Sequence, residues 1–320
     1  MHILKPNEYQ LFEYICGMSE KALLKTMSSF LNTNYSNVIS TRDYIIATGN
    51  IPVAIVAHLD TVFPTPAKNI YYDRQKNVIW SSEGLGADDR AGVFGIIKLI
   101  KAGYRPHIIF TTGEESGGLG ATQLVMDYPD PPFDVKYIIE LDRQGVNDCV
   151  FYNCGNEEFI SYVETFGFVE DIGTFSDISV ICPEWEIAGV NLSIGYKHEH
   201  TYVETFHINA FNATIQKVSD MLLSIDTVKE PFKYIPGMSA YYQQWYNANA
   251  KYQCCQCKKS FTEYELFPTK TRSRQHKNYC ADCMVNRVSW CEICAEPFEV
   301  DEYTKNLTVC YDCLEDAGNV

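Results

Sequence analysis

Two adjacent carboxylates, Asp88 and Asp89, stand in a glycine-rich turn directly before the apolar, helical stretch Val93–Ile100. Gly86 and Gly92, on either side of the pair, allow backbone conformations and close approaches that side chains forbid. Asp is favoured at the N-cap of a helix, so capping is one explanation of the pair. The other is metal binding, with one carboxylate shared between two cations. The neighbouring motifs decide between these explanations.

Further polar side chains follow segments that the sequence predicts as buried strands. His58 and Asp60 come after the almost wholly apolar run Ile51–Ala57. Residues i and i+2 of a strand point to the same side, so Asp60 can support His58 as a metal ligand. The other such groups are Glu114 and Glu115 after His107–Phe110, Asp142 after Val135–Leu141, and His200 after Ala188–Ile194, with His198 as a competing candidate.

Strands, loops and helices alternate through residues 1–230, which predicts a three-layer α/β/α fold with a mostly parallel central sheet. In such sheets ligands bind beyond the carboxyl ends of the strands, where the polar groups lie. We also expect one helix over residues 7–31, a hairpin over Ile70–Trp80 and a closing helix over Phe211–Ile225. Ser176 and Asp177 are interpreted as a simple turn, and lining of the substrate pocket is the less favoured alternative.

The ordered motifs resemble those of the co-catalytic dizinc exopeptidases, a clan that includes zinc aminopeptidases, peptidase T-like tripeptidases, carboxypeptidase G-like enzymes and aminoacylases. Each motif is weak alone, but five occur in the expected order within about residues 5–227. They are Ala57–Val62, Gly86–Gly92, Thr112–Glu115, Asp142 and His200–Thr205.

The resemblance implies a role for each of these polar residues. One zinc ion would be held by His58 and Asp142, the other by Glu115 and His200, and both by the bridging Asp88. Glu114 would act as the general base and Asp60 would support His58. Co²⁺ or Mn²⁺ are possible replacements for the two catalytic zinc ions. The implied reaction is hydrolysis of an amide bond at a chain end or on a small molecule.

The short intervals between these motifs bear on the substrate. Larger members of the clan insert extra domains between such motifs, and the intervals from His58 to Asp88 and from Asp142 to His200 leave no room for one. The resemblance is therefore closest to single-domain aminopeptidases acting on peptides. A deacylase or amidohydrolase of small N-acyl compounds is the alternative enzyme.

Nine of the 13 cysteines lie after residue 250, and eight of these form Cys-x-x-Cys pairs. Two sets of four thiolates match the ligand requirement of two structural zinc ions, so we expect a zinc-finger domain of zinc-ribbon or treble-clef type over residues 251–320, joined by a linker over 231–250. Sequential ligation is favoured by the similarity of the two halves, although interleaved ligation fits the spacing too. The ligands are Cys254, Cys257, Cys280 and Cys283, then Cys291, Cys294, Cys310 and Cys313.

The charge of the chain limits its partners. A net charge of −15 disfavours general binding to nucleic acid or anionic membranes, and no apolar run has the length of a membrane span. The basic segment around Lys270–Lys277 leaves nucleic acid open as a partner of the tail, while the acidic second half favours a protein. The alternative to an enzyme is a non-catalytic adaptor that binds nucleic acid or protein through the zinc fingers. The Cys-x-x-Cys pairs indicate metal binding and not a disulfide framework, and there is no signal-peptide pattern, so we expect a cytoplasmic location. The oligomeric state is left open.

Overall fold

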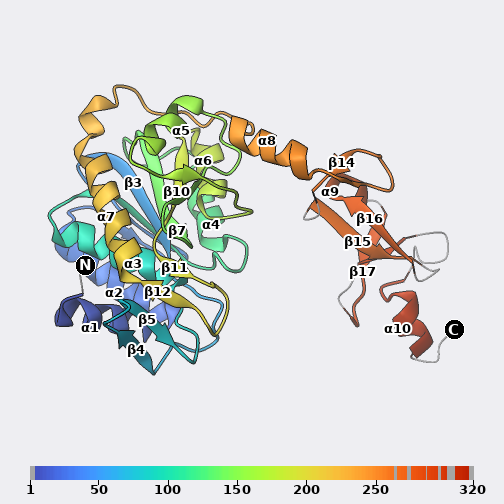
Figure 1. The fold of residues 1–320 in the computed structure, drawn as a ribbon, viewed down its shortest axis with the longest axis horizontal. Helices are drawn as coiled ribbons and strands as arrows, with labels where there is room; N and C mark the ends of the chain where they lie inside the picture. Colours follow the sequence, from blue (N-terminus) through green and yellow to red (C-terminus); the bar gives the residue numbers. More distant parts are fainter. Residues whose placement is uncertain are drawn as a thin grey trace. The chain divides into compact units, whose positions relative to one another are not determined.

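The computed structural model describes residues 4–262, 265–271, 275–285, 287–294, 297–300 and 307–316 (Figure 1). The chain divides into two compact units, Met1–Ser239 and Ala240–Val320, which are described separately. No helix of the described residues is long and apolar enough to cross a membrane.

An eight-stranded sheet forms the centre of the first unit, in the order β1-β2-β6-β3-β7-β10-β8-β9. The four central strands, from β6 to β10, run parallel. At the two sides of this group, β2 pairs with β6 and β8 pairs with β10 in antiparallel orientation. The strands are β1 (Val38–Ser40), β2 (Tyr44–Ala47), β3 (Ile51–His58), β6 (Pro106–Thr111), β7 (Tyr137–Arg143), β8 (Asp148–Val150), β9 (Val169–Glu170) and β10 (Gly189–Ser193).

Helices cover both faces of this sheet, so the predicted α/β/α fold class is confirmed (Figure 1). Alternate residues of β3 enter two separate hydrophobic cores: Val53 and Ile55 enter one, Ala54 and Val56 the other. Burial on both faces explains why this strand is apolar throughout. One core includes α1 (Pro6–Cys16), α2 (Glu20–Asn34), α3 (Ala87–Lys101), α5 (Glu157–Glu164) and α7 (Ile208–Leu223), and the other α4 (Leu119–Asp127) and α6 (Ile178–Trp185).

A second sheet of the first unit has the order β11-β12-β5-β4. Strands β4 (Ile70–Asp73) and β5 (Val78–Ser81) form the hairpin that the sequence predicted. Strands β11 (Tyr196–Lys197) and β12 (Thr205–His207) were not predicted, because two or three residues are too short to give a periodic pattern. The loop between them carries His200.

The prediction of a single helix over residues 7–31 is wrong. Helix α1 ends at Cys16 and α2 begins at Glu20. Gly17 follows the last residue of α1, and the Ser19 hydroxyl caps α2 by accepting a hydrogen bond from the amide of Ala22 at 3.4 Å. A serine before an acidic first turn is a start signal for a new helix, and the apolar rhythm on both sides of the break hid it.

The expected linker segment, residues 231–250, is divided between the two units. Phe232 packs against the core of the first unit, and bridges join Lys233 to Ile187 and Pro236 to Cys154. The remainder forms α8 (Ala240–Asn249) of the second unit.

The second unit contains a hairpin and a four-stranded sheet in the order β16-β15-β18-β17. The hairpin consists of β13 (Tyr252–Gln253) and β14 (Ser260–Phe261). The sheet consists of β15 (Leu266–Lys270), β16 (His276–Cys280), β17 (Val288–Trp290) and β18 (Pro297–Glu299), with the short helices α9 (Ala281–Met284) and α10 (Tyr311–Asp316).

Candidate metal centre

Two groups of potential metal ligands meet at Asp88. Its Oδ1 lies 3.0 Å from His58 Nε2, which in turn lies 3.4 Å from Asp142 Oδ1. Its Oδ2 lies 3.2 Å from His200 Nε2, which lies 3.0 Å from Glu115 Oε2. The structure thus brings together all five residues that the sequence proposed as ligands of this centre. His200, whose side chain is about half exposed, faces Asp88, and His198 belongs to neither group of potential ligands.

Neighbouring strands explain this convergence. His58 ends β3, and Asp142 lies near the end of β7, which pairs with β3 in parallel. Glu115 follows β6, the parallel neighbour of β3 on its other side. Asp88 comes from the start of α3, which can approach β7 closely because residue 92 is glycine. A Cβ at Gly92 would lie 2.4 Å from the carbonyl oxygen of Leu141.

Asp60 connects three parts of the site. Its Oδ1 and Oδ2 accept hydrogen bonds from the amides of Glu114 and Glu115, both at 3.1 Å. Its Oδ1 also lies 3.3 Å from His58 Nδ1, on the opposite side of the ring from Asp88. Asp60 therefore fixes the turn that carries both glutamates and places a carboxylate oxygen beside the His58 ring.

The donor set fits a pair of divalent cations. Tetrahedral coordination with bonds of about 2.0 Å places ligand atoms about 3.3 Å apart. The distances from His58 to Asp88 and Asp142, and from His200 to Asp88 and Glu115, match that spacing. Five carboxylates, those of Asp60, Asp88, Glu114, Glu115 and Asp142, surround only two imidazoles. In addition, Glu115 Oε1 is buried without a hydrogen-bond partner. Cations would compensate this charge and use this oxygen.

Burial and neighbouring charges raise the pKa values of two glutamates and one histidine of the centre. Burial, together with the charge of Asp142, raises the pKa of Glu114 to about 9. Burial and Asp88 raise the pKa of Glu115 to about 7. The hydrogen bond to Asp88 raises the pKa of His200 to about 9, although burial acts against it. Positive charge in the centre favours the ionised carboxylates, and hence the form of Glu114 that accepts a proton.

A buried polar network behind Asp142 was not predicted from the sequence. Ser176 Oγ donates to Glu140 Oε2 at 2.5 Å and lies 3.2 Å from Asp142 Oδ2, and Tyr196 donates to Asp142 Oδ1 at 3.1 Å. Asn191 forms two hydrogen bonds with the backbone of Asp142. These contacts fix the carboxylate that faces His58.

Ser176 and Asp177 are therefore more than the simple turn that the sequence favoured. Both side chains are fully buried, and Asp177 accepts a hydrogen bond from Thr111 at the end of β6. One signal was visible in the sequence: Glu140 interrupts an apolar strand two residues before Asp142, on the same face.

Solved structures of peptidases share the fold of this chain. The aminopeptidase PepT of Bacillus cereus ATCC 10987 has a TM-score of 0.56 and 15% identity, covering 70% of this chain and 99% of that one. A tripeptidase of Staphylococcus aureus subsp. aureus Mu50 has a TM-score of 0.57 and 13% identity, with coverage of 70% and 99%. An aminopeptidase of Desulfurococcus kamchatkensis has a TM-score of 0.51 and 13% identity, covering 70% of this chain and 98% of that one. No family model and no curated protein sequence matches the chain.

At this level of identity the comparisons establish the fold alone. The chain has the fold of these peptidases, as expected from the order of its motifs.

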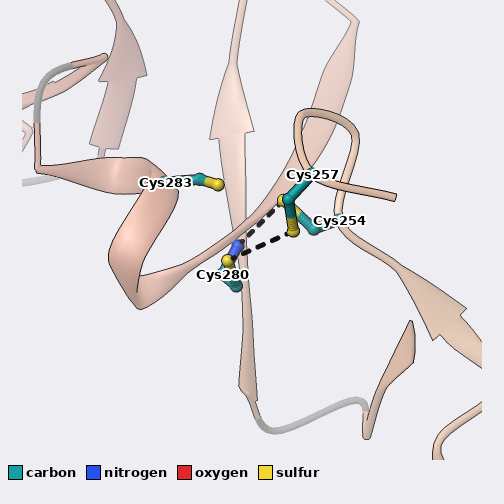
Figure 2. Close-up of side chains that lie close together, drawn as sticks. All are labelled: Cys254, Cys257, Cys280 and Cys283. Carbon is teal, nitrogen blue, oxygen red and sulfur yellow. Dashed lines mark hydrogen bonds between the residues drawn. The ribbon is translucent and has the colours of Figure 1, made fainter. Parts of the chain in front are cut away.

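Eight of the nine cysteines of the second unit form two clusters, each made from consecutive pairs along the chain. Figure 2 shows Cys254 and Cys257 facing Cys280 and Cys283. The sulfur atoms of Cys257 and Cys280 lie 3.9 Å apart, and those of Cys294 and Cys310 lie 3.7 Å apart. Zinc–sulfur bonds of about 2.3 Å in a tetrahedron place sulfurs about 3.8 Å apart, so both clusters fit zinc. The grouping is sequential.

The two clusters repeat one local geometry. The amide of Cys280 donates to Cys254 Sγ at 3.4 Å, and the amide of Cys310 donates to Cys291 Sγ at 3.3 Å. Against the effect of burial, backbone amides lower the pKa of Cys254 and that of Cys291 to about 6. Thiolates are the form that binds zinc. Cys255 belongs to neither cluster.

Proposed function

We propose that the first unit is a metal-dependent peptidase of the aminopeptidase type, with one pair of divalent cations held by His58, Asp88, Glu115, Asp142 and His200. The observation that supports this most directly is the position of Asp88, whose two oxygens face two different histidines. A simple helix cap has no need of either histidine. The shared fold with aminopeptidases is in accord with this function.

The residues divide the chemistry between them. Two bound cations would polarise the scissile carbonyl and lower the pKa of a water molecule. Glu114 takes the proton from the attacking water and passes it to the leaving amine, first as a base and then as an acid. Its carboxylate is adjacent to Glu115 in the turn held by Asp60, so the proton acceptor stays beside the ligands.

The substitution Glu114→Gln tests the role of the proton acceptor. We expect kcat to fall by a factor of about 10² to 10⁴ on peptide substrates, because general acid–base catalysis contributes about that much. Metal content should be unchanged, since Glu114 is not among the proposed ligands. The matched control is Glu164→Gln at the exposed end of α5, which should keep full activity.

The substrate panel distinguishes the two enzyme classes. It contains aminoacyl anilides, di- and tripeptides, and N-acyl amino acids. Turnover of the first two sets supports an aminopeptidase, and turnover of the last set alone supports a deacylase. Failure to hydrolyse any of them, with metal in both cysteine clusters and none at Asp88, would refute the enzyme and favour the adaptor.

We also propose that each cysteine cluster holds one structural zinc ion. Among the described residues of the second unit, buried apolar contacts gather in two small clusters built around the cysteines. Small domains of this kind depend on metal for folding.

A further inference from the structure

Glu204 is a buried carboxylate with no part in the reaction described above. Only 1% of the residue is exposed, and it lies four positions after His200, directly before β12. Its Oε2 accepts a hydrogen bond from the amide of Ala87 at 3.1 Å, and its Oε1 accepts one from the amide of Asp88 at 3.0 Å. Glu204 therefore holds the backbone of the turn that carries the shared ligand.

These amides begin helix α3, where no neighbouring side chain caps them. The first amides of a helix lack partners within it and need an acceptor from elsewhere. The residue before the helix is Gly86, which has φ of 66° and no side chain to offer. A Cβ there would lie 3.0 Å from Cγ2 of Thr61. The acceptor comes instead from a residue 116 positions beyond Asp88.

We propose that Glu204 is a positioning residue that sets Asp88 between the two metal positions. Asp88 must direct one oxygen to each histidine, so a small rotation of its backbone misplaces both. The same segment of chain supplies His200, and Glu204 ties that segment to the Asp88 turn. Asp88 and His200, two ligands of the same proposed metal position, thus both depend on the carboxylate of Glu204. This inference rests on the proposed dimetal centre.

A carboxylate is required at this position. It offers two acceptor oxygens, whereas the amide of glutamine has one acceptor and one donor group. In Glu204→Gln, one of the two backbone amides would face an NH₂ group inside the protein, and a buried donor without an acceptor is costly. Glu204→Asp keeps the charge but shortens the side chain, so it cannot reach both amides without movement.

The test uses Mn²⁺ as a probe on the full chain, because Mn²⁺ prefers oxygen and nitrogen ligands while the thiolate clusters prefer zinc. Titration calorimetry gives the two binding constants, and the electron paramagnetic resonance spectrum reports whether two Mn²⁺ ions are spin-coupled. We expect Glu204→Gln to weaken binding of the second Mn²⁺ ion by about 10- to 100-fold, as substitution of residues that orient metal ligands does. The signal of the spin-coupled pair should be lost. Excess Mn²⁺ should restore part of kcat.

Glu170→Gln is the matched control. Glu170 is a buried carboxylate that accepts a hydrogen bond from Ser239. This substitution should lower the melting temperature while both Mn²⁺ constants stay unchanged. Glu204→Asp provides a second variant if the glutamine variant does not fold, and it should show a smaller loss of the same kind.

The two possible failures are distinguishable. Retention of both binding constants and of the coupled signal in folded Glu204 variants, with only a lower melting temperature, would overturn the positioning role and leave the dimetal centre intact. Absence of a coupled Mn²⁺ pair in the unsubstituted protein would overturn the dimetal centre itself.

Discussion

Asp88 presents one oxygen to each of two histidines, and this separates its proposed role from that of a helix cap. We predict that Asp88→Ala removes both metals of the first unit and abolishes activity, while the cysteine clusters stay loaded. Zinc content should fall from four ions per chain, one for each group of ligands, to two. Elemental analysis together with an activity assay measures both effects.

The control for this prediction is Asn156→Ala. Asn156 caps α5 by accepting a hydrogen bond from the amide of Phe159 at 3.1 Å. Loss of a cap costs about 1 kcal/mol of stability and should change neither zinc content nor activity. An Asp88→Ala protein that behaves like this control would show that Asp88 is only a cap.

The positions of the candidate ligands were predictable because each follows a recognisable apolar strand, and parallel strands end at one edge of a sheet. The residues that support these ligands were not predictable. Ser176 contacts Asp142 from 34 positions away, and Glu204 contacts the amide of Asp88 from 116 positions away. Contacts of this kind depend on how loops pack over the finished sheet, and the local pattern of the sequence does not encode them.

At the scale of elements, His107 of β6 joins three segments. Its Nδ1 accepts a hydrogen bond from the amide of Gly49 at 3.1 Å, and its Nε2 lies 2.8 Å from the carbonyl oxygen of Asp134. Since a carbonyl only accepts, Nε2 carries the proton and the ring is neutral. The ring also stacks on Phe133, with centroids 4.0 Å apart. A second proton would place Nδ1–H against the Gly49 amide.

Burial lowers the pKa of His107 below its ordinary value of 6.5. The unfolded chain therefore takes up this proton at a higher pH than the folded protein. We predict that its contribution to the free energy of unfolding is complete above about pH 6.5 and is lost as the pH falls through the folded pKa. Denaturant titrations of the metal-loaded protein at several pH values measure this.

Comparison with His107→Gln isolates the contribution of His107, because the carboxylates of the metal centre titrate in both proteins. The glutamine variant should be less stable at neutral pH, and the difference between the two proteins should shrink as the pH falls. A difference that is constant with pH would contradict the assignment of a neutral His107.

Elements with clear local signals were predicted well, as the hairpin of β4 and β5 shows, because turn residues separate its two apolar runs. The break between α1 and α2 was missed because the apolar rhythm continues across it, and only the capping of α2 by Ser19 marks the new start. Strands of two or three residues, such as β11 and β12, exist because their neighbours pair with them. Their own sequences are too short to specify them.

At the scale of the whole molecule, the two units should respond differently to loss of metal. We predict that Cys283→Ser removes one zinc ion and makes the second unit sensitive to proteolysis, because one cluster loses a ligand. The first unit has its own core and should keep its peptidase activity. Zinc analysis, limited proteolysis and an activity assay are the measurements.

Cys255→Ser is the control for that experiment, since Cys255 lies outside both clusters. It should retain four zinc ions and resist proteolysis as the unsubstituted chain does. Equal loss of zinc in the two variants would contradict the assignment of Cys283, and not Cys255, as a ligand.

The shared sheet of the second unit restricts how the chain can be shortened. Strand β15, from the part with the first cluster, pairs with β18, from the part with the second, and Lys277 of β16 forms an ion pair with Glu299 of β18 at 2.8 Å. A fragment that stops before β17 would turn β15 from an interior strand into an edge strand with unpaired amide and carbonyl groups. Such edges recruit other chains, so this fragment should aggregate even with its own zinc bound.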